Sequence, residues 1–196
     1  MIKYFEFENA IEKIETILDQ LNNNQELNFD KIKKLNKEKD ELYKKIYSNL
    51  DSWQKVQVSR HGERPHTLDY IKHIFNDIVF LHGDKKYADD NAILGGLAKI
   101  DGNSVIFIGT EKGNTMETRI KHNFGMAKPE GYRKVQRLLK LAEKFKLPLI
   151  SFVDTAGAFP GKDAEERGQS ESIASSILQF LNTNIPTISI IIGEGG

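Results

Sequence analysis

Two short, predominantly apolar runs in the second half of the chain each follow an amphipathic helical segment. Residues Glu130–Lys146 precede the run at 149–153, and residues 164–181 precede the run at 187–192. Strands that alternate with helices pair in parallel through crossover connections. A strand that is apolar on both of its faces, without a polar alternation, is typical of a sheet covered on both sides. The sequence therefore predicts an α/β fold built on parallel strands.

The predicted sheet begins with a β-hairpin. The apolar runs 92–100 and 104–109 flank Asp101-Gly102-Asn103, and Asp-Gly between two such runs is a strong turn signal. Before the hairpin, we expect a short helix that has Thr67 as its N-cap and extends through Phe80. After it, we expect residues 111–129 to be irregular.

The amino-terminal part of the chain predicts a helical hairpin. Apolar residues recur at helical spacing from Ile11 to Leu21 and again from Ile32 to Leu50, with an asparagine-rich run between them. Asn28 is expected to be the N-cap of the second helix. We therefore divide the chain into an amino-terminal helical extension, residues 1–60, and an α/β domain, residues 61–196.

Composition excludes several classes of function. The 28 basic and 28 acidic side chains give a net charge of zero, which argues against broad electrostatic binding to nucleic acid or to an anionic membrane. The absence of cysteine excludes disulfides, thiolate metal sites and a cysteine nucleophile. No signal peptide is recognisable, and no apolar run approaches the roughly 20 residues that span a bilayer. The expectation is a cytoplasmic protein with no nucleic-acid and no membrane partner.

A glycine-rich loop, Thr155–Gly161, stands between a predicted strand and a predicted helix. Such a loop can direct backbone N–H groups and a helix N-terminus at an anion or a developing oxyanion. No Gly-Lys-Ser/Thr sequence closes it, so it is not an ATP-binding P-loop. Phe159-Pro160 adds rigidity without polar chemistry, which suits the wall of a pocket. From the residues alone, a structural loop and a binding loop both remain open.

Acid–base and metal chemistry find little support in the sequence. Ser151 and Ser170 lack the glycine context of a nucleophile elbow. Asp89-Asp90 could bind a cation, although a turn before a strand is the favoured interpretation. No metal site is expected. The five histidines lack metal-ligand spacing and are expected to be surface or loop residues: His61, His66, His73, His82 and His122.

Three basic residues around Phe124-Gly-Met126 could clamp an anionic substrate: Arg119, Lys121 and Lys128. An α/β chain that offers loop amides but no evident nucleophile, base or metal points to one kind of chemistry. Such a protein stabilises an enolate or oxyanion and leaves proton or group transfer to the substrates.

A long series of segments occurs in the order of one known family. These are Arg60-His61, Arg64-Pro65, Thr67-Leu-Asp-Tyr70, Tyr87-Ala-Asp-Asp90, Gly95-Gly96, Asn123-Phe-Gly-Met126, Pro129-Glu-Gly-Tyr-Arg-Lys134, Asp154-Thr155, Gly157-Ala158, Pro160-Gly161, Ala164-Glu-Glu-Arg-Gly-Gln-Ser-Glu171 and Gly193-Glu-Gly-Gly196. Over essentially its whole length the chain resembles the alpha subunits of bacterial acetyl-CoA carboxylase carboxyltransferases.

The resemblance implies a crotonase-like fold, the ββα superhelix of the ClpP/crotonase type, with the helical hairpin as an amino-terminal extension. It implies an enzyme that transfers the carboxyl group of carboxybiotin, carried by a biotin carboxyl carrier protein, to acetyl-CoA. The product is malonyl-CoA for fatty acid biosynthesis. The implied partners are a zinc-containing beta subunit in an α2β2 assembly, the carrier protein and biotin carboxylase, to which the ATP-dependent step belongs. Backbone amides would stabilise the two oxyanions.

The resemblance also implies where carboxybiotin lies. The expected substrate-binding residues are Gly157, Ala158, Phe159, Pro160, Gly161, Gly193, Gly195 and Gly196. The family commonly has proline at the position of Ala156 and often tyrosine at that of Phe159, so this loop is slightly looser and lacks one hydroxyl. The family pattern continues beyond Gly196 with the glycine pair expected to supply the biotin-side oxyanion amides. The chain is therefore expected to be a fragment with an incomplete fold, inactive alone.

Other functions stay open. A carboxyltransferase for a different acyl-CoA fits the same residues, because most of the acyl pocket would belong to the beta subunit. A non-catalytic half that only docks the beta subunit is another alternative. A crotonase-type hydratase is disfavoured, since no acidic residue stands in a convincing catalytic context.

Overall fold

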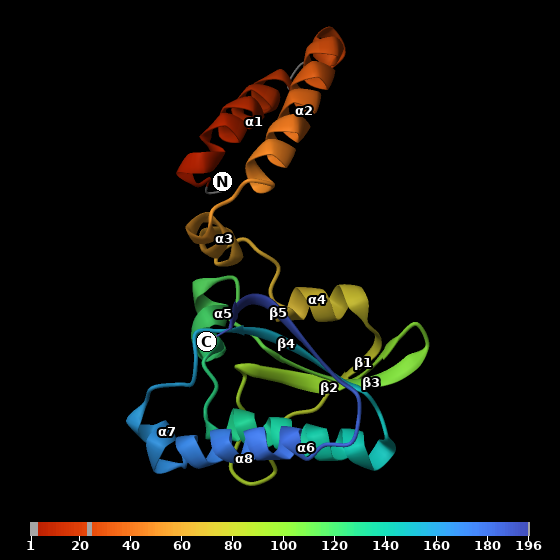
Figure 1. The fold of residues 1–196 in the computed structure, drawn as a ribbon, viewed down its shortest axis with the longest axis vertical. Coiled ribbons are helices and arrows are strands. Elements are labelled where there is room, and N and C mark those ends of the chain that lie inside the picture. The colour runs from red at the N-terminus through yellow and green to blue at the C-terminus, as the bar shows by residue number, and fades with distance from the viewer. Residues whose placement is uncertain (1–3, 23–24, 196) are drawn as a thin grey trace. The chain divides into compact units, whose positions relative to one another are not determined.

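The computed structural model describes residues 4–22 and 25–195 (Figure 1). The chain divides into two compact units, Met1–Val58 and Ser59–Gly196. Within the described residues, no helix combines the length and the apolar character needed to cross a membrane.

The first unit contains the predicted helical hairpin. A 3₁₀ turn (Glu6–Glu8) leads into α1 (Asn9–Asn22), followed by α2 (Gln25–Tyr47) and the short α3 (Ser52–Ser59). Ile11, Ile14 and Leu18 form the buried stripe of α1. The expected N-cap at Asn28 is wrong, because α2 begins at Gln25 and Asn28 lies inside it. Neither glycine nor proline interrupts residues 25–28, and Gln-Glu-Leu is a good helix-forming sequence.

The second unit is built on a five-stranded sheet in the order β1-β2-β3-β4-β5. The strands are β1 (Asn76–Phe80), β2 (Ile93–Ile100), β3 (Asn103–Thr110), β4 (Leu149–Thr155) and β5 (Thr187–Gly195). β1, β2 and β3 pair antiparallel, whereas β3, β4 and β5 pair in parallel. The predicted hairpin is confirmed: Asp101 and Gly102 have φ values of 48° and 80°, as a tight two-residue turn between strands requires.

Helices cover both faces of this sheet (Figure 1). The helices of this unit are α4 (Thr67–Ile74), α5 (Met116–Lys121), α6 (Pro129–Phe145), α7 (Lys162–Glu166) and α8 (Gln169–Leu181), with a 3₁₀ turn at Asn123–Gly125. On one face, Leu138 and Leu139 of α6 pack in a cluster with Ile106 and Ile108 of β3. On the other face, α4 packs against the sheet, and the ring of its flanking residue Phe75 lies 5.6 Å from that of Phe107. The predicted helix 130–146 and the later strand–helix alternation are confirmed.

The helix expected to extend to Phe80 is too long. It ends at Ile74, and residues 76–80 form β1, in which Val79 pairs with Leu97. The sequence Ile78-Val-Phe80 is β-branched and aromatic, so it favours a strand once β2 offers an edge. His66, rather than Thr67, is the N-cap residue of α4.

Two further local expectations are wrong. Residues 111–129 are not wholly irregular, because Thr115 caps α5 by accepting the N–H of Thr118 at 3.2 Å. The single helix expected over 164–181 is divided into α7 and α8. Gly168 lies between them with φ of 80°, a conformation that a continuous helix does not contain.

The last strand departs from expectation in two ways. The strand is longer than the run expected over 187–192, because β5 continues through Gly193 to Gly195. The predominantly apolar runs predicted cover on both faces, and Leu149 and Ile150 of β4 are buried as expected. β5 is an edge strand, however, and the side chains of Ile188 and Ile191 are 54% and 68% exposed.

Candidate functional site

A cavity of about 310 Å³ lies at the carboxyl ends of β3, β4 and β5. Lys112 follows β3, Asp154 stands near the end of β4, and Glu194 stands near the end of β5. The segment 59–66 closes the cavity from another side. This edge of a parallel sheet is where α/β proteins bind ligands. A larger groove of about 590 Å³ beside α8 and β5 carries no Asp, Glu, Lys, Arg or His in its lining, so we place polar chemistry in the smaller cavity.

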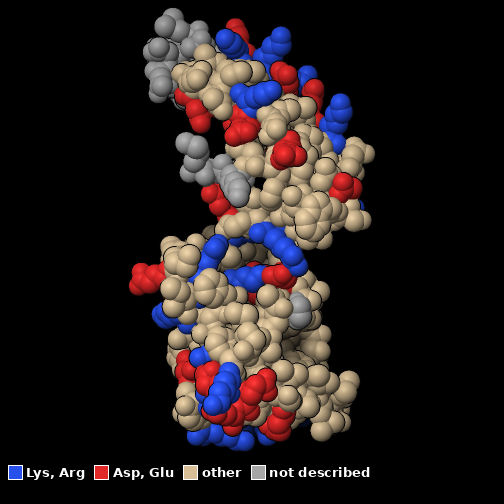
Figure 2. Space-filling view, turned by 90° about the vertical axis from the view of Figure 1, so that its left-hand side faces the viewer, with Lys and Arg blue, Asp and Glu red and all other residues tan. Residues whose placement is uncertain are grey.

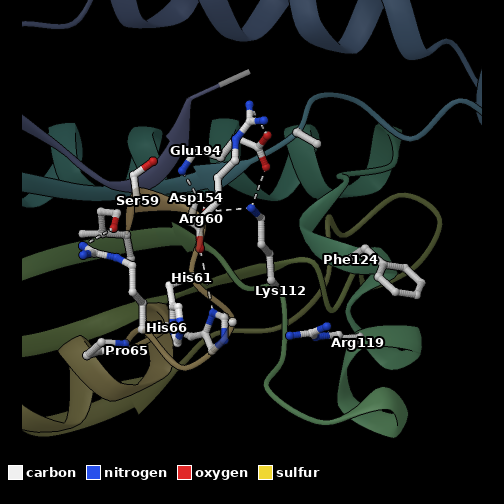
Figure 3. Close-up of a pocket in the computed structure, with 14 residues that line it drawn as sticks. Ser59, Arg60, His61, Pro65, His66, Lys112, Arg119, Phe124, Asp154 and Glu194 are labelled. Carbon is white, nitrogen blue, oxygen red and sulfur yellow. Dashed lines mark hydrogen bonds and ion pairs between the residues drawn. The ribbon is translucent and has the colours of Figure 1, made fainter. Parts of the chain in front are cut away.

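Charged side chains from three strand ends meet in this cavity (Figure 3). The Lys112 ammonium lies 2.8 Å from Asp154 Oδ1 and 2.8 Å from Glu194 Oε2. Arg60 Nη2 lies 2.7 Å from Glu194 Oε1. Lys112 therefore links the ends of β4 and β5, and Arg60 ties the preceding loop to the same cluster. Figure 2 shows lysine and arginine side chains gathered around a hollow on the face that carries α5 and the end of β5.

A bulge in β5 brings Glu194 into the cluster. β4 and β5 pair in register up to Val153 and Ile191, and the next pair is Thr155 with Gly195. β5 therefore has three residues opposite the single residue Asp154. The Asp154 carboxylate fills this interruption by accepting the backbone N–H of Glu194 at 3.0 Å. Such bulges re-aim side chains beside functional sites.

Gly193 is required by this close approach. A Cβ atom at Gly193 would lie 2.5 Å from Asp154 Oδ1. Any side chain at this position would therefore displace the Asp154 carboxylate. Gly193 was expected from the sequence to bind substrate. The structure adds a second reason for glycine at this position, because only glycine leaves room for the Asp154 carboxylate.

Asp154 is held as a carboxylate. Burial raises its pKa, but His66, Lys112 and the backbone N–H of Glu194 act in the opposite direction, and the resulting pKa is about 2. Its backbone N–H donates to Thr110 Oγ1 at 2.6 Å, which joins the ends of β3 and β4. At neutral pH, Asp154 is a fixed negative charge rather than an acid–base group.

His66 lies beneath this carboxylate. It is only 9% exposed, and its Nδ1 lies 3.8 Å from Asp154 Oδ2, beyond direct hydrogen-bonding distance. Neither ring nitrogen has a hydrogen-bond partner in the described part of the chain. His66 is thus a loop residue, as expected, but it is buried rather than at the surface. His82, by contrast, has an exposed side chain and lies 3.0 Å from Asp89.

The predicted anion clamp is only partly assembled. Arg119 lines the cavity, and its Nε donates to the carbonyl oxygen of Gly113 at 3.2 Å. Lys121 is exposed on the same helix and does not line the cavity. Lys128 lies over the ring of Phe159, 4.6 Å from its centroid, also outside the lining. The structure instead pairs Arg119 with the arginines of the segment 59–66 as cavity-lining cations.

The glycine loop lies next to the cavity. Ala156 lines it, whereas residues 157–161 do not. Two loop N–H groups donate within the protein: that of Gly157 to Thr155 Oγ1 at 3.0 Å, and that of Phe159 to the carbonyl oxygen of Ala127 at 3.0 Å. Gly195 pairs with Thr155. Gly196 lies outside the described residues. The role of this set in carboxybiotin binding remains a prediction.

Asp89 and Asp90 serve the turn that precedes β2. Asp89 forms an ion pair with Lys134, and Asp90 accepts the backbone N–H groups of Ala92 and Lys128 at 2.9 and 2.7 Å. Their oxygens are thus used within the protein. Across the described ranges, no group of three or more His, Asp or Glu side chains could hold a metal ion.

Lys112, Asp154 and Glu194 were not expected from the sequence to be site residues. They are separated by as many as 82 residues in the chain and share no local motif. One available signal was their position, since each stands at or just beyond the carboxyl end of a strand in the parallel part of the sheet. Such ends meet at one edge.

Solved structures confirm the predicted fold class. The chain is similar to the beta subunit of P. aeruginosa geranyl-CoA carboxylase, with a TM-score of 0.53 and 20% identity, over 67% of this chain and 23% of that one. It is also similar to transcarboxylase 12S, with a TM-score of 0.54 and 20% identity, over 66% of this chain and 24% of that one. At these identities the likeness shows the crotonase-like fold of carboxyltransferases alone.

Sequence comparison gives the family. Residues 4–196 match the profile of the family described as acetyl co-enzyme A carboxylase carboxyltransferase-like. The acetyl-coenzyme A carboxylase carboxyl transferase subunit alpha of Paramagnetospirillum magneticum is 51% identical over 195 residues, covering 97% of this chain and 62% of that protein. The protein of the same name from Zymomonas mobilis is 49% identical over 199 residues, covering 100% of this chain and 64% of that protein. The chain thus spans less than two thirds of the length of these relatives. It belongs to the acetyl-CoA carboxylase carboxyltransferase family.

Proposed function

We propose that the chain forms the alpha part of an acetyl-CoA carboxylase carboxyltransferase. In this function, the carboxyl group of carboxybiotin on a biotin carboxyl carrier protein passes to acetyl-CoA, and malonyl-CoA for fatty acid biosynthesis is formed. The observation that carries the proposal is 51% identity over 195 residues to a protein of that name. The proposed partners are a beta subunit that contains zinc, the carrier protein and biotin carboxylase, in the cytoplasm.

The cavity suits a carboxylated cofactor. Its lining contains four side chains that are cationic at neutral pH and two carboxylates, so an anionic group is favoured there. Carboxybiotin, when bound, supplies the carboxyl group that is transferred. The chain's own contribution is to bind and orient, because Asp154 has a pKa of about 2 and does not exchange protons at neutral pH.

We also propose that the glycine loop and the end of β5 flank the biotin ring. The residues are Gly157, Ala158, Phe159, Pro160, Gly161, Gly193, Gly195 and Gly196. Two neighbours support this assignment, since Ala156 and Glu194 both line the cavity. Gly193 packs against Asp154, so the β5 end of this set lies beside the charged cluster.

The test is an assay of the reverse reaction. The chain as given, and the chain completed with the carboxyl-terminal residues of the P. magneticum relative, are each co-expressed with a beta subunit. Decarboxylation of malonyl-CoA is then measured with free biotin as acceptor. We propose that the completed chain is active and the chain as given is not. Activity of both would contradict the placement of the biotin-side amides beyond Gly196.

The same assay separates the alternatives. Methylmalonyl-CoA is tested beside malonyl-CoA, and a preference for it would replace acetyl-CoA by a longer acyl-CoA as the substrate. Co-purification with the beta subunit without turnover of either compound would favour a docking role. Asp101→Asn is the control variant, because Asp101 is exposed in the hairpin turn, far along the sheet from the cavity edge.

A further inference from the structure

We infer that the cavity at the carboxyl ends of β3, β4 and β5 is a binding site for a single oxyanion group, a carboxylate or a phosphate, and that Arg119 is its principal ligand. This deepens the proposed function, on which it rests for the placement of an anionic group in this cavity, by naming the side chain that binds the group. It concerns recognition by a side chain and can be tested without carboxyl transfer.

The charges that line the cavity do not balance. Arg60, Arg64, Lys112 and Arg119 contribute four positive charges, while Asp154 and Glu194 contribute two negative charges, which leaves a net charge of +2 with the histidines neutral. Both carboxylates are engaged by Arg60 and Lys112 at 2.7–2.8 Å. In the described ranges, Arg64 and Arg119 have no Asp or Glu oxygen within 4.0 Å. The unpaired positive charge favours an anion in the cavity.

The two unpaired arginines differ in what they can offer. Arg64 donates from Nη2 to the carbonyl oxygen of Ile192 at 3.0 Å, and its Nε is buried without a partner. Arg119 is fixed through Nε, which donates to the carbonyl oxygen of Gly113. No hydrogen bond within the described residues uses the terminal nitrogens of Arg119. A guanidinium anchored at Nε presents these two donors as a rigid fork that matches the two oxygens of a carboxylate or phosphate.

The direction of Arg119 agrees with this role. Figure 3 shows its guanidinium pointing from α5 into the cavity, toward the side from which His61 and His66 enter. A Cβ atom at Gly62 would lie 3.7 Å from Arg119 Nη2, so the guanidinium reaches across to the segment 59–66. Arg119 therefore bridges the opening rather than extending into solvent.

The apolar wall of the cavity strengthens this charge. Pro65, Phe124, Ala156 and Ile192 line it between the charged groups. Phe124 has φ of 54°, a left-handed conformation that bulky residues rarely adopt and that is concentrated at functional sites. Apolar walls exclude part of the water that would otherwise screen Arg119, so an oxyanion there interacts more strongly than at an open surface.

Lys121 provides a matched control. It stands two residues beyond Arg119 on α5 and is exposed outside the cavity lining. Arg119→Gln and Lys121→Gln each remove one positive charge from the same helix. Only the first removes a donor from the cavity. Non-specific screening of surface charge would affect both variants alike.

The experiment is an NMR titration of the ¹⁵N-labelled 196-residue chain with sodium phosphate and, separately, sodium acetate, at constant ionic strength maintained with sodium chloride. We expect saturable shifts of amides around the cavity with Kd in the millimolar range. Arg119→Gln should weaken binding about tenfold or more, since a hydrogen bond to a charged group contributes about 1.5–3 kcal/mol. Lys121→Gln should change Kd less than about twofold. The tighter of the two anions identifies the ligand group as phosphate or carboxylate.

The inference is overturned if the wild-type shifts do not saturate, or if both charge-removing variants bind equally well. Arg119→Lys is included in case Arg119→Gln loses the dispersed spectrum of a folded chain. It keeps the charge but not the fork and should weaken binding several-fold, whereas unchanged binding would refute the role of the fork. If the chain binds the anion but the assembled enzyme does not transfer a carboxyl group, the proposed function is refuted and this inference is not. If the assembled enzyme transfers the carboxyl group but anion binding does not depend on Arg119, this inference is refuted and the proposed function is not.

Discussion

Asp154 makes the stability of the second unit depend on pH. Its pKa in the folded protein is about 2, against an ordinary value of 3.8. Each pKa unit is worth about 1.4 kcal/mol, so the ionised carboxylate stabilises the folded state by about 2 kcal/mol. Because the folded pKa is the lower one, this contribution is fully present above about pH 4. It is lost as the pH falls toward about 2, where the folded carboxylate also becomes protonated.

Asp154→Asn removes this charge while keeping the size of the side chain. We expect the free energy of unfolding to fall by about 2 kcal/mol at neutral pH, because Lys112 and the N–H of Glu194 lose their anionic partner. The deficit should shrink steadily below about pH 4 and nearly vanish near pH 2. Urea unfolding followed by far-UV circular dichroism measures it, with Asp101→Asn as a control expected to stay within about 0.5 kcal/mol of wild type.

Two results would refute this reasoning. One is a stability deficit of Asp154→Asn that is the same at every pH, which would assign its effect to packing rather than to charge. The other is direct observation of the Asp154 carboxyl carbon by NMR, assigned with the variant, titrating at its ordinary pKa. Either result would mean that the link between β4, β5 and Lys112 does not depend on an ionised Asp154.

Three further substitutions test other parts of the structure. Gly193→Ala should cost about 1–3 kcal/mol and speed exchange of the Glu194 amide, because the new Cβ meets Asp154 Oδ1; unchanged exchange would contradict the bulge. Lys134→Met should cost about 3 kcal/mol in urea unfolding, since Lys134 is 2% exposed and pairs with Asp89, and Lys134→Met/Asp89→Asn should recover part of it. Gly102→Ala should lower the free energy of unfolding by about 1 kcal/mol. The loss comes from the φ of 80° alone, because no atom lies within 4 Å of the added Cβ. An unchanged free energy of unfolding would show that the turn relaxes.

The elements that sequence reasoning predicted well are those with local causes. The Asp101-Gly102 turn needs only two residues with positive φ, and the helix Pro129–Phe145 carries its own apolar face. β1 was missed because its pairing depends on β2, whose first residue comes 13 positions after the end of β1. The break between α7 and α8 depends on the single residue Gly168, which the surrounding helical pattern conceals.

The site was less predictable than the fold, for a physical reason. Glycines at 193 and 195 favour a turn on local grounds, yet β5 continues because its backbone groups still pair with β4. What the glycine permits is the close approach of Asp154, and no local pattern in the sequence encodes that approach. Arg119 was identified as a basic residue near a loop, but its companions in the cavity come from a segment more than 50 positions earlier.

Asp154 connects the geometry of the strands with the charge of the cavity. One of its oxygens, Oδ1, accepts the N–H of Glu194 and lies 2.8 Å from Lys112 Nζ. The first contact sets how β5 bulges and so where the Glu194 carboxylate stands. The second neutralises Lys112, which Glu194 also engages. Asp154 and Glu194 neutralise Lys112 and Arg60. The positive charge that can bind a ligand therefore belongs to Arg64 and Arg119, which have no acidic partner in the described part of the chain. A change at Gly193 should therefore alter both strand register and anion affinity, although Gly193 carries no charge.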